Sequence, residues 1–167
     1  MDLVWDVDYQ QASQGVRVRV ISTIAVDEAK YLEGFTADPA IVALACTAFT
    51  HRLWVHMTIN LDGQRITAMN VLPDCSLAPL PPGTAKEGAV SVEWLRLVQS
   101  DFGQWPEVEV HFADGQHAMD KSKKGFIEPI VRAGLISGEG VFDLDLQGDT
   151  IRRVRVTYGR QENSATD

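Results

Sequence analysis

The chain has 167 residues, of which 45% are hydrophobic and 23% are charged, and its formal net charge is −8 at pH 7. This length suits one domain that can bury a core without disulfide staples. The acidic balance argues against general nucleic-acid binding, because neutralising phosphates requires a basic surface. No apolar run approaches the roughly 20 residues that cross a bilayer, and no basic and then apolar leader precedes the first strand pattern. A cytoplasmic protein without membrane contact is therefore expected.

Alternating apolar and polar residues predict two neighbouring strands at the start of the chain, over residues 3–9 and 16–24. The first carries Asp6 and Asp8 on its polar face, and the second carries two arginines on the face that would meet them. Cross-strand ion pairs explain this arrangement better than a metal site at the Asp-x-Asp sequence, because each aspartate already has a basic partner. We expect these charges to fix the register of the two strands.

Helix signals occur at four places in the chain. Residues 27–33 precede a glycine stop, and residues 129–134 begin with proline and end with glycine. Residues 92–102 fit both helical and strand spacing, with helical spacing slightly favoured. Residues 39–50 follow the capping residue Asp38 and are apolar on almost every side, which predicts a helix buried against the sheet.

The segment 53–72 has the pattern of a β-hairpin that turns at Asp62-Gly63, a dipeptide suited to a two-residue turn. Counting outward from this turn places an apolar strip on the face expected to meet solvent. Such a strip is typical of a protein-binding surface. The residues of this predicted strip are Trp54, His56, Met69 and Val71.

A second hairpin is predicted to turn at Asp114-Gly115. A two-residue turn there places Glu109 directly opposite Asp120, with His111 on the same face. Facing carboxylates are unfavourable without a cation between them, so these three residues are candidates for a divalent-ion site that hydrolyses phosphoesters or for acid and base chemistry. The alternative is that strand pairing ends before Asp120, which then starts a loop.

The same register places His117 on the face opposite His111, so the sequence predicts no zinc site at the histidines. A basic cluster follows the hairpin and precedes the last predicted helix. Its amides and charges could hold a phosphate or carboxylate, although such a run is more commonly a solvated turn. The candidate anion-binding residues are Lys121, Ser122, Lys123 and Lys124.

The last hairpin is predicted over residues 141–158 and requires one irregularity, because Ile151 is out of phase with the apolar residues that follow it. A bulge around Arg152-Arg153 would return these residues to one face. Residues 161–167 are polar and are expected to form a frayed tail.

The predicted fold is a single α+β domain over residues 1–160. It has a mainly antiparallel sheet of β-hairpins, the buried helix over 39–50, and one or two further short helices. The GxSxG, GxGxxG, HExxH and phosphate-loop motifs are absent from the sequence. The leading functional hypothesis is therefore a non-catalytic protein-binding module, such as an inhibitor or accessory factor. It would contact a protein partner or a second copy of itself and require no cofactor.

Two alternatives stay open at this point. The first is a divalent-metal-dependent hydrolase or nuclease that uses Glu109, His111 and Asp120. The second is a small-ligand-binding domain with a pocket between the buried helix and the sheet.

Overall fold

The structure is a computed structural model, and it describes residues 2–22, 30–73, 89–98, 107–120 and 125–158. The predicted tail over 161–167 lies outside these residues. The described part contains two α-helices, a short 3₁₀ helix and ten strands. In chain order these are β1 (Asp2–Gln10), η1 (Gln11–Ser13), β2 (Gly15–Ser22), β3 (Lys30–Thr36), α1 (Pro39–His51), β4 (Trp54–Ile59), β5 (Ile66–Val71), β6 (Val92–Val98), β7 (Glu107–Phe112), β8 (His117–Asp120), α2 (Ile127–Ser137), β9 (Gly140–Gln147) and β10 (Thr150–Tyr158).

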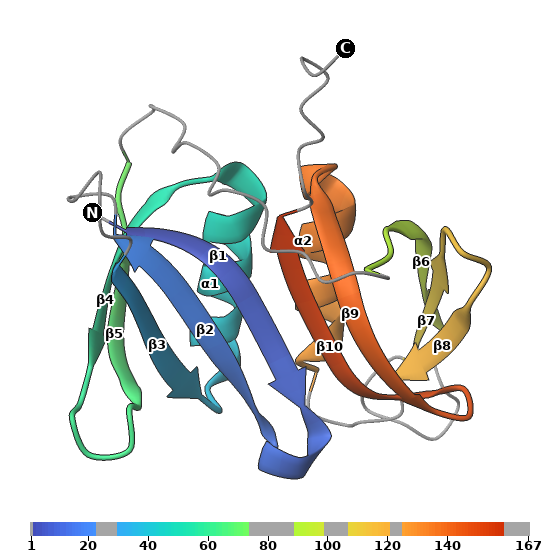
Figure 1. The fold of residues 1–167 in the computed structure, drawn as a ribbon, viewed down its shortest axis with the longest axis horizontal. Helices are drawn as coiled ribbons and strands as arrows, with labels where there is room; N and C mark the ends of the chain where they lie inside the picture. Colours follow the sequence, from blue (N-terminus) through green and yellow to red (C-terminus); the bar gives the residue numbers. More distant parts are fainter. Residues whose placement is uncertain (1, 23–29, 74–88, 99–106, 121–124, 159–167) are drawn as a thin grey trace.

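The strands form one open, mixed sheet. Its main path runs β3-β2-β1-β10-β8-β7-β6, while the β4–β5 hairpin joins β1 and β9 lies beside β10. These ladders are antiparallel except for the short parallel contact of β10 with β8. Figure 1 shows α1 and α2 on the same face of the long central strands, with β4–β5 at one end of the molecule and β6–β8 at the other. Strands with two helices agree with the predicted α+β class.

The helix α1 begins where its sequence predicts. Oδ1 of Asp38 accepts a hydrogen bond of 2.9 Å from the amide of Ala40, which satisfies one of the free donors at the helix start. The buried side of α1 includes Val42 and Phe49, but Leu44 is 36% exposed. The helix is therefore buried on one side, although its sequence is apolar all round.

Three predictions about helices are wrong. Residues 30–33 of the expected helix over 27–33 belong to strand β3, where Gly34 lies against Ile66 of β5 and has no room for a side chain. Residues 92–98 of the ambiguous segment form strand β6, because their backbone pairs with β7, and residues 99–102 lie outside the described residues. The last helix is longer than expected, and Gly134 lies inside α2 instead of ending it.

The β4–β5 hairpin contains an irregularity that the sequence did not signal. Next to the turn, Ile59 pairs with Ile66. The following pair is Thr58 with Ala68, so Thr67 has no opposite residue and forms a β-bulge in β5. A one-residue shift exchanges the faces of every residue beyond it. Met69 and Val71 therefore face Met57 and Val55, away from Trp54 and His56. Trp54 and Met69 are buried, Val71 is half-buried and His56 is exposed, so the predicted apolar strip does not form.

Other register predictions are confirmed. Asp6 faces Arg19 and Asp8 faces Arg17 across β1 and β2, and the predicted bulge in the last hairpin occurs between Ile151 and Arg153. The described helices include none that is long and apolar enough to cross a membrane.

The buried side chains form one hydrophobic cluster between the helices and the sheet. Helix α2 packs tightly at Gly134, where an added Cβ would lie 2.2 Å from the Phe142 ring. At the other helix, the Tyr158 hydroxyl donates a 2.6 Å hydrogen bond to the carbonyl of Phe49, and the two rings stack at 4.2 Å. The core thus packs α2 against β9 and α1 against β10, and β10 is the strand that pairs with β8.

Candidate metal centre

The turn between β7 and β8 decides which side chains share a face. The amides of Phe112 and Gly115 bond to the carbonyls of Gln116 and Phe112, and Gly115 has φ +87. The loop therefore has three residues, with glycine in the left-handed conformation that such loops require. Asp114 supports the turn by accepting a 3.0 Å bond from the Gln116 amide.

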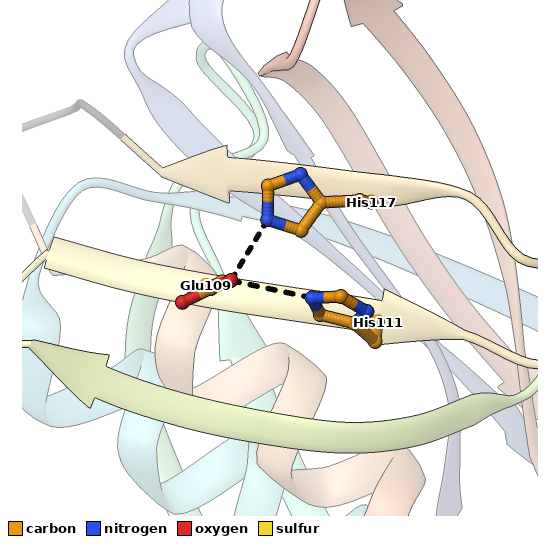
Figure 2. Close-up of side chains that lie close together, drawn as sticks. All are labelled: Glu109, His111 and His117. Atoms are coloured by element: carbon orange, nitrogen blue, oxygen red, sulfur yellow. Dashed lines mark hydrogen bonds and ion pairs between the residues drawn. The ribbon is translucent and has the colours of Figure 1, made fainter.

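The three-residue loop shifts the hairpin by one residue relative to the predicted register. His111 faces His117, Glu109 faces Met119, and Val108 faces Asp120. Because neighbouring residues of a strand point to opposite faces, His117 joins Glu109 and His111 on the outer face. Figure 2 shows these three side chains converging from two adjacent strands.

The ligand atoms of these three side chains lie close together. Nε2 of His117 lies 2.9 Å from Oε1 of Glu109, and Nε2 of His111 lies 3.2 Å from the same oxygen. Among the described residues, this is the group of three such side chains whose ligand atoms all lie within 4.8 Å of one another. The Glu109 side chain is 19% exposed and both histidines are more open, so the cluster is accessible from solvent.

The neighbouring strand β6 contributes two further contacts. Trp94 faces His111, and the two rings stack at 3.6 Å with an interplanar angle of 17°. Arg96 faces Glu109, with its Nε 3.5 Å from Oε2, the carboxylate oxygen that does not contact the histidines. The indole limits the movement of one imidazole, while the guanidinium adds positive charge beside the carboxylate.

The electrostatics of the cluster favour an ionised Glu109. Hydrogen bonds from His117 and then His111, together with the charge of Arg96, hold the pKa of Glu109 below its ordinary value of 4.5. Without an ion, each imidazole Nε2–H donates to this carboxylate. With an ion, the same nitrogen would lose its proton and present a lone pair.

The spacing fits a transition-metal ion of the zinc class. An ion held tetrahedrally by nitrogen and oxygen at about 2.1 Å separates its ligand atoms by roughly 3.4 Å. The two contacts of Glu109 are already near this value. All three ligands come from one side of the sheet, so the remaining coordination positions would face solvent. Two imidazoles, one carboxylate and an open position form the ligand set of several catalytic zinc sites, in which the ion activates a bound water.

The site differs from the one that the sequence predicted. Glu109 and His111 are brought together as expected, but Asp120 faces the interior and is 4% exposed. The expected pairing of two carboxylates is therefore wrong, and His117 takes the place of Asp120. A predicted loop of three residues, with Gly115 in the left-handed conformation, would have placed His117 on the same face as Glu109 and His111. The candidate anion-binding residues Lys121, Ser122, Lys123 and Lys124 lie outside the described residues.

Comparisons of the chain with protein-family models, curated proteins and solved structures find no match.

The small-ligand alternative has a weaker basis in the described structure. A cavity of about 320 Å³ is lined by Trp5, Arg19, Tyr31 and Glu33, all from β1, β2 and β3. These residues are not from α1, whereas the predicted pocket lay between that helix and the sheet. Nε of Arg19 also lies 3.0 Å from Oε2 of Glu33, so the two charged groups in this cavity already satisfy each other.

Proposed function

We propose that this protein binds a divalent transition-metal ion of the zinc class through Glu109, His111 and His117. The observation that carries this proposal is the convergence of three ligand atoms within 4.8 Å on one sheet face. The β7–β8 ladder already holds the three side chains together, so binding would cost little side-chain ordering.

The donor set supports zinc-class ions over magnesium or calcium. Imidazole nitrogen suits zinc, copper, nickel and iron, whereas magnesium and calcium take oxygen ligands and this cluster offers oxygen from a single residue. Among the described residues, Arg96 is a cationic group beside Glu109 that opposes the binding of a metal ion. Its side chain is 63% exposed, so it can turn away from Glu109 into solvent when an ion binds.

Isothermal titration of the metal-stripped protein with Zn²⁺ tests the proposal. We expect one ion per chain and little heat with Mg²⁺. Because Zn²⁺ binding releases protons, the measured heat should change with the ionisation enthalpy of the buffer. His117→Ala and Glu109→Gln each remove one ligand, so each should weaken Zn²⁺ binding by at least the roughly 10- to 100-fold that outer-shell changes cause.

The matched control is His56→Ala, because it removes an exposed histidine on β4, away from the cluster. This variant should bind Zn²⁺ as the wild type does. Equal affinity in the wild type and in His117→Ala would refute the proposed site.

A protein-binding function is the second candidate, at a surface other than the predicted strip. The observation in its favour is strand β6, which ends the main path of the sheet and leaves Trp94 37% and Leu97 52% exposed. A terminal strand with exposed apolar side chains offers backbone hydrogen bonds and apolar contact to a partner strand. This proposal is independent of ion binding, because an apo protein presents the same strand.

A further inference from the structure

Arg96 is a side chain beside the metal centre whose position ion binding does not explain. It faces Glu109 across β6 and β7, and its Nε lies 3.5 Å from Oε2. A guanidinium has no lone pair, so it cannot be a ligand, and its charge repels an incoming cation. An arginine at this position therefore becomes favourable beside a bound ion only when an anion contacts both cations.

The charges of the loaded cluster would favour such an anion. Imidazole ligands bind a metal in their neutral form, so of the three ligands only Glu109 neutralises part of the charge of Zn²⁺. One positive charge then remains on the ion and its ligands, and Arg96 adds a second. Glu107 lies on the same face of β7 but is exposed, so solvent screens its opposing charge. A local excess of positive charge would thus form on a chain whose net charge is −8.

The geometry places the guanidinium beside the open side of the ion. Glu109, His111 and His117 approach from the outer face of the sheet, and Arg96 projects from the same face because it pairs with Glu109. The histidines contact Oε1 of Glu109, whereas Arg96 contacts Oε2. The ion and the guanidinium would therefore flank one carboxyl group. Two cations at this separation are close enough for a second carboxylate, or a phosphate, to bridge them from the solvent side.

We propose that the metal-loaded cluster and Arg96 together bind an oxyanion, the carboxylate or phosphate group of a small molecule. One oxygen takes an open position of the ion, and another accepts hydrogen bonds from the guanidinium, whose planar fork of donors suits both groups. The Arg96 side chain is 63% exposed, so it can rotate from Glu109 to the bound anion. The inference rests on the proposed metal centre and names the substrate class of that site.

A single substitution should change the two affinities in different ways. Arg96→Gln removes a cation that opposes the metal, so Zn²⁺ alone should bind at least as tightly as in the wild type. The same variant removes a charge-assisted hydrogen bond to the anion, which should bind on the order of tenfold more weakly. Because the two binding events are linked, a saturating anion should raise metal affinity more in the wild type than in the variant. A purely structural role for Arg96 would weaken the binding of metal and anion together.

The full chain loaded with Co²⁺ provides the readout, because Co²⁺ binds the same ligand types as Zn²⁺ and its visible absorption changes when a further ligand enters its coordination sphere. The protein is titrated at constant ionic strength with acetate in one series and methyl phosphate in the other, in a buffer free of other oxyanions. The anion that binds more tightly identifies the group that the ligand carries.

Two further variants sharpen the test. Arg96→Lys keeps the charge without the fork of donors, so it should restore only part of the anion affinity. Arg65→Gln is the matched control, because Arg65 is exposed and directly precedes β5, at the end of the molecule opposite β6–β8 (Figure 1). It should bind both anions as the wild type does. Metal loading of each variant checks that it is folded.

The expected result is a saturable spectral change with at least one anion that is weakened in Arg96→Gln. Bound Co²⁺ that responds to neither anion, or that responds equally in the wild type and Arg96→Gln, would overturn the inference and leave the metal centre intact. Full anion affinity in Arg96→Lys would contradict the forked contact. A wild type that binds neither Co²⁺ nor Zn²⁺ would instead refute the metal centre, and the inference with it.

Discussion

Two carboxylates of the same sheet are paired with different bases. Asp6 of β1 is 1% exposed, and its Oδ2 lies 2.5 Å from Nη2 of Arg155. Glu109 of β7 is more open and contacts two histidines. Arginine keeps its charge at every physiological pH and has no lone pair to offer, whereas a neutral imidazole is a metal ligand. The first arrangement is closed to an added cation, and the second is open to one.

The same difference explains why the Asp-x-Asp sequence of β1 is not a metal site. Asp8 repeats the pattern of Asp6, with its two oxygens 3.1 and 3.0 Å from Nε and Nη2 of Arg153. Burial is the first cause that raises the pKa of Asp6, and the ion pair with Arg155 opposes it. An acidic pair in a sheet is thus not a metal site where arginines held in the sheet already neutralise it.

The largest expected effect comes from breaking the buried ion pair between Asp6 and Arg155. Asp6→Ala leaves Arg155 buried without its partner, and we expect a loss of about 3–5 kcal/mol in the free energy of unfolding. Urea denaturation measures this loss. Replacing both partners, Asp6→Leu with Arg155→Leu, should recover most of this stability, because an apolar pair leaves no buried charge without a partner. A loss near zero in Asp6→Ala would show that the pair is not a stability element.

The cluster of Glu109, His111 and His117 should stabilise the folded protein when it binds an ion. At a free Zn²⁺ concentration of roughly 100 times the dissociation constant, we expect the free energy of unfolding to rise by about 2.7 kcal/mol. Thermal melts with and without Zn²⁺ test this. The increase should vanish in His111→Ala and persist in His56→Ala. A similar increase in all three proteins would mean that the ion acts elsewhere.

The two arrangements should respond differently to acid. Zn²⁺ binding releases protons from its ligands, so Zn²⁺ affinity should fall as the pH is lowered. Without Zn²⁺, the lowered pKa of Glu109 means that its stabilising effect is present above the ordinary value of 4.5 and is lost as the pH falls below it. Glu109→Gln should remove this small acid dependence. A pH profile of unfolding identical in wild type and variant would contradict the hydrogen bonds assigned to Glu109.

The smallest expected effect is that of Asp120→Asn, which distinguishes the observed β7–β8 register from the predicted one. Asp120→Asn should leave Zn²⁺ affinity unchanged, because Asp120 faces the interior. The predicted register would make it a ligand, so a strong loss of affinity in a variant that stays folded would favour that register. Titration calorimetry beside a thermal melt of the same sample gives both readouts.

Local signals in the sequence were sufficient for much of the fold. The capped start of α1, the positions of both Asp-Gly turns, the bulge before Arg153 and the facing of Asp6 with Arg19 follow from short-range chemistry. These features depend on residues that are close in sequence or on the period of a strand, and such signals are visible without a structure.

The candidate site required more than local signals. An Asp-Gly pair is compatible with loops of two or three residues, and the difference of one residue decides which face every side chain occupies. This choice misplaced His117 and Asp120. An unsignalled bulge at Thr67 misplaced Met69 and Val71 in the same way. Strand β6 was missed because its pairing with β7 outweighed an ambiguous periodicity, a tertiary effect.

The pairing of β1 with β10 has a consequence for how the chain reaches this structure. Asp6 and Arg155 are 149 residues apart in sequence, yet they form a buried pair in the middle of the sheet. Contacts of such high contact order form late, because a long loop must close before they are made. On the ribosome, the first strand is synthesised long before the last one, so Asp6 must remain solvated until β10 emerges. Synthesis rate and chaperone access, rather than local propensity, should therefore set the yield of folded protein.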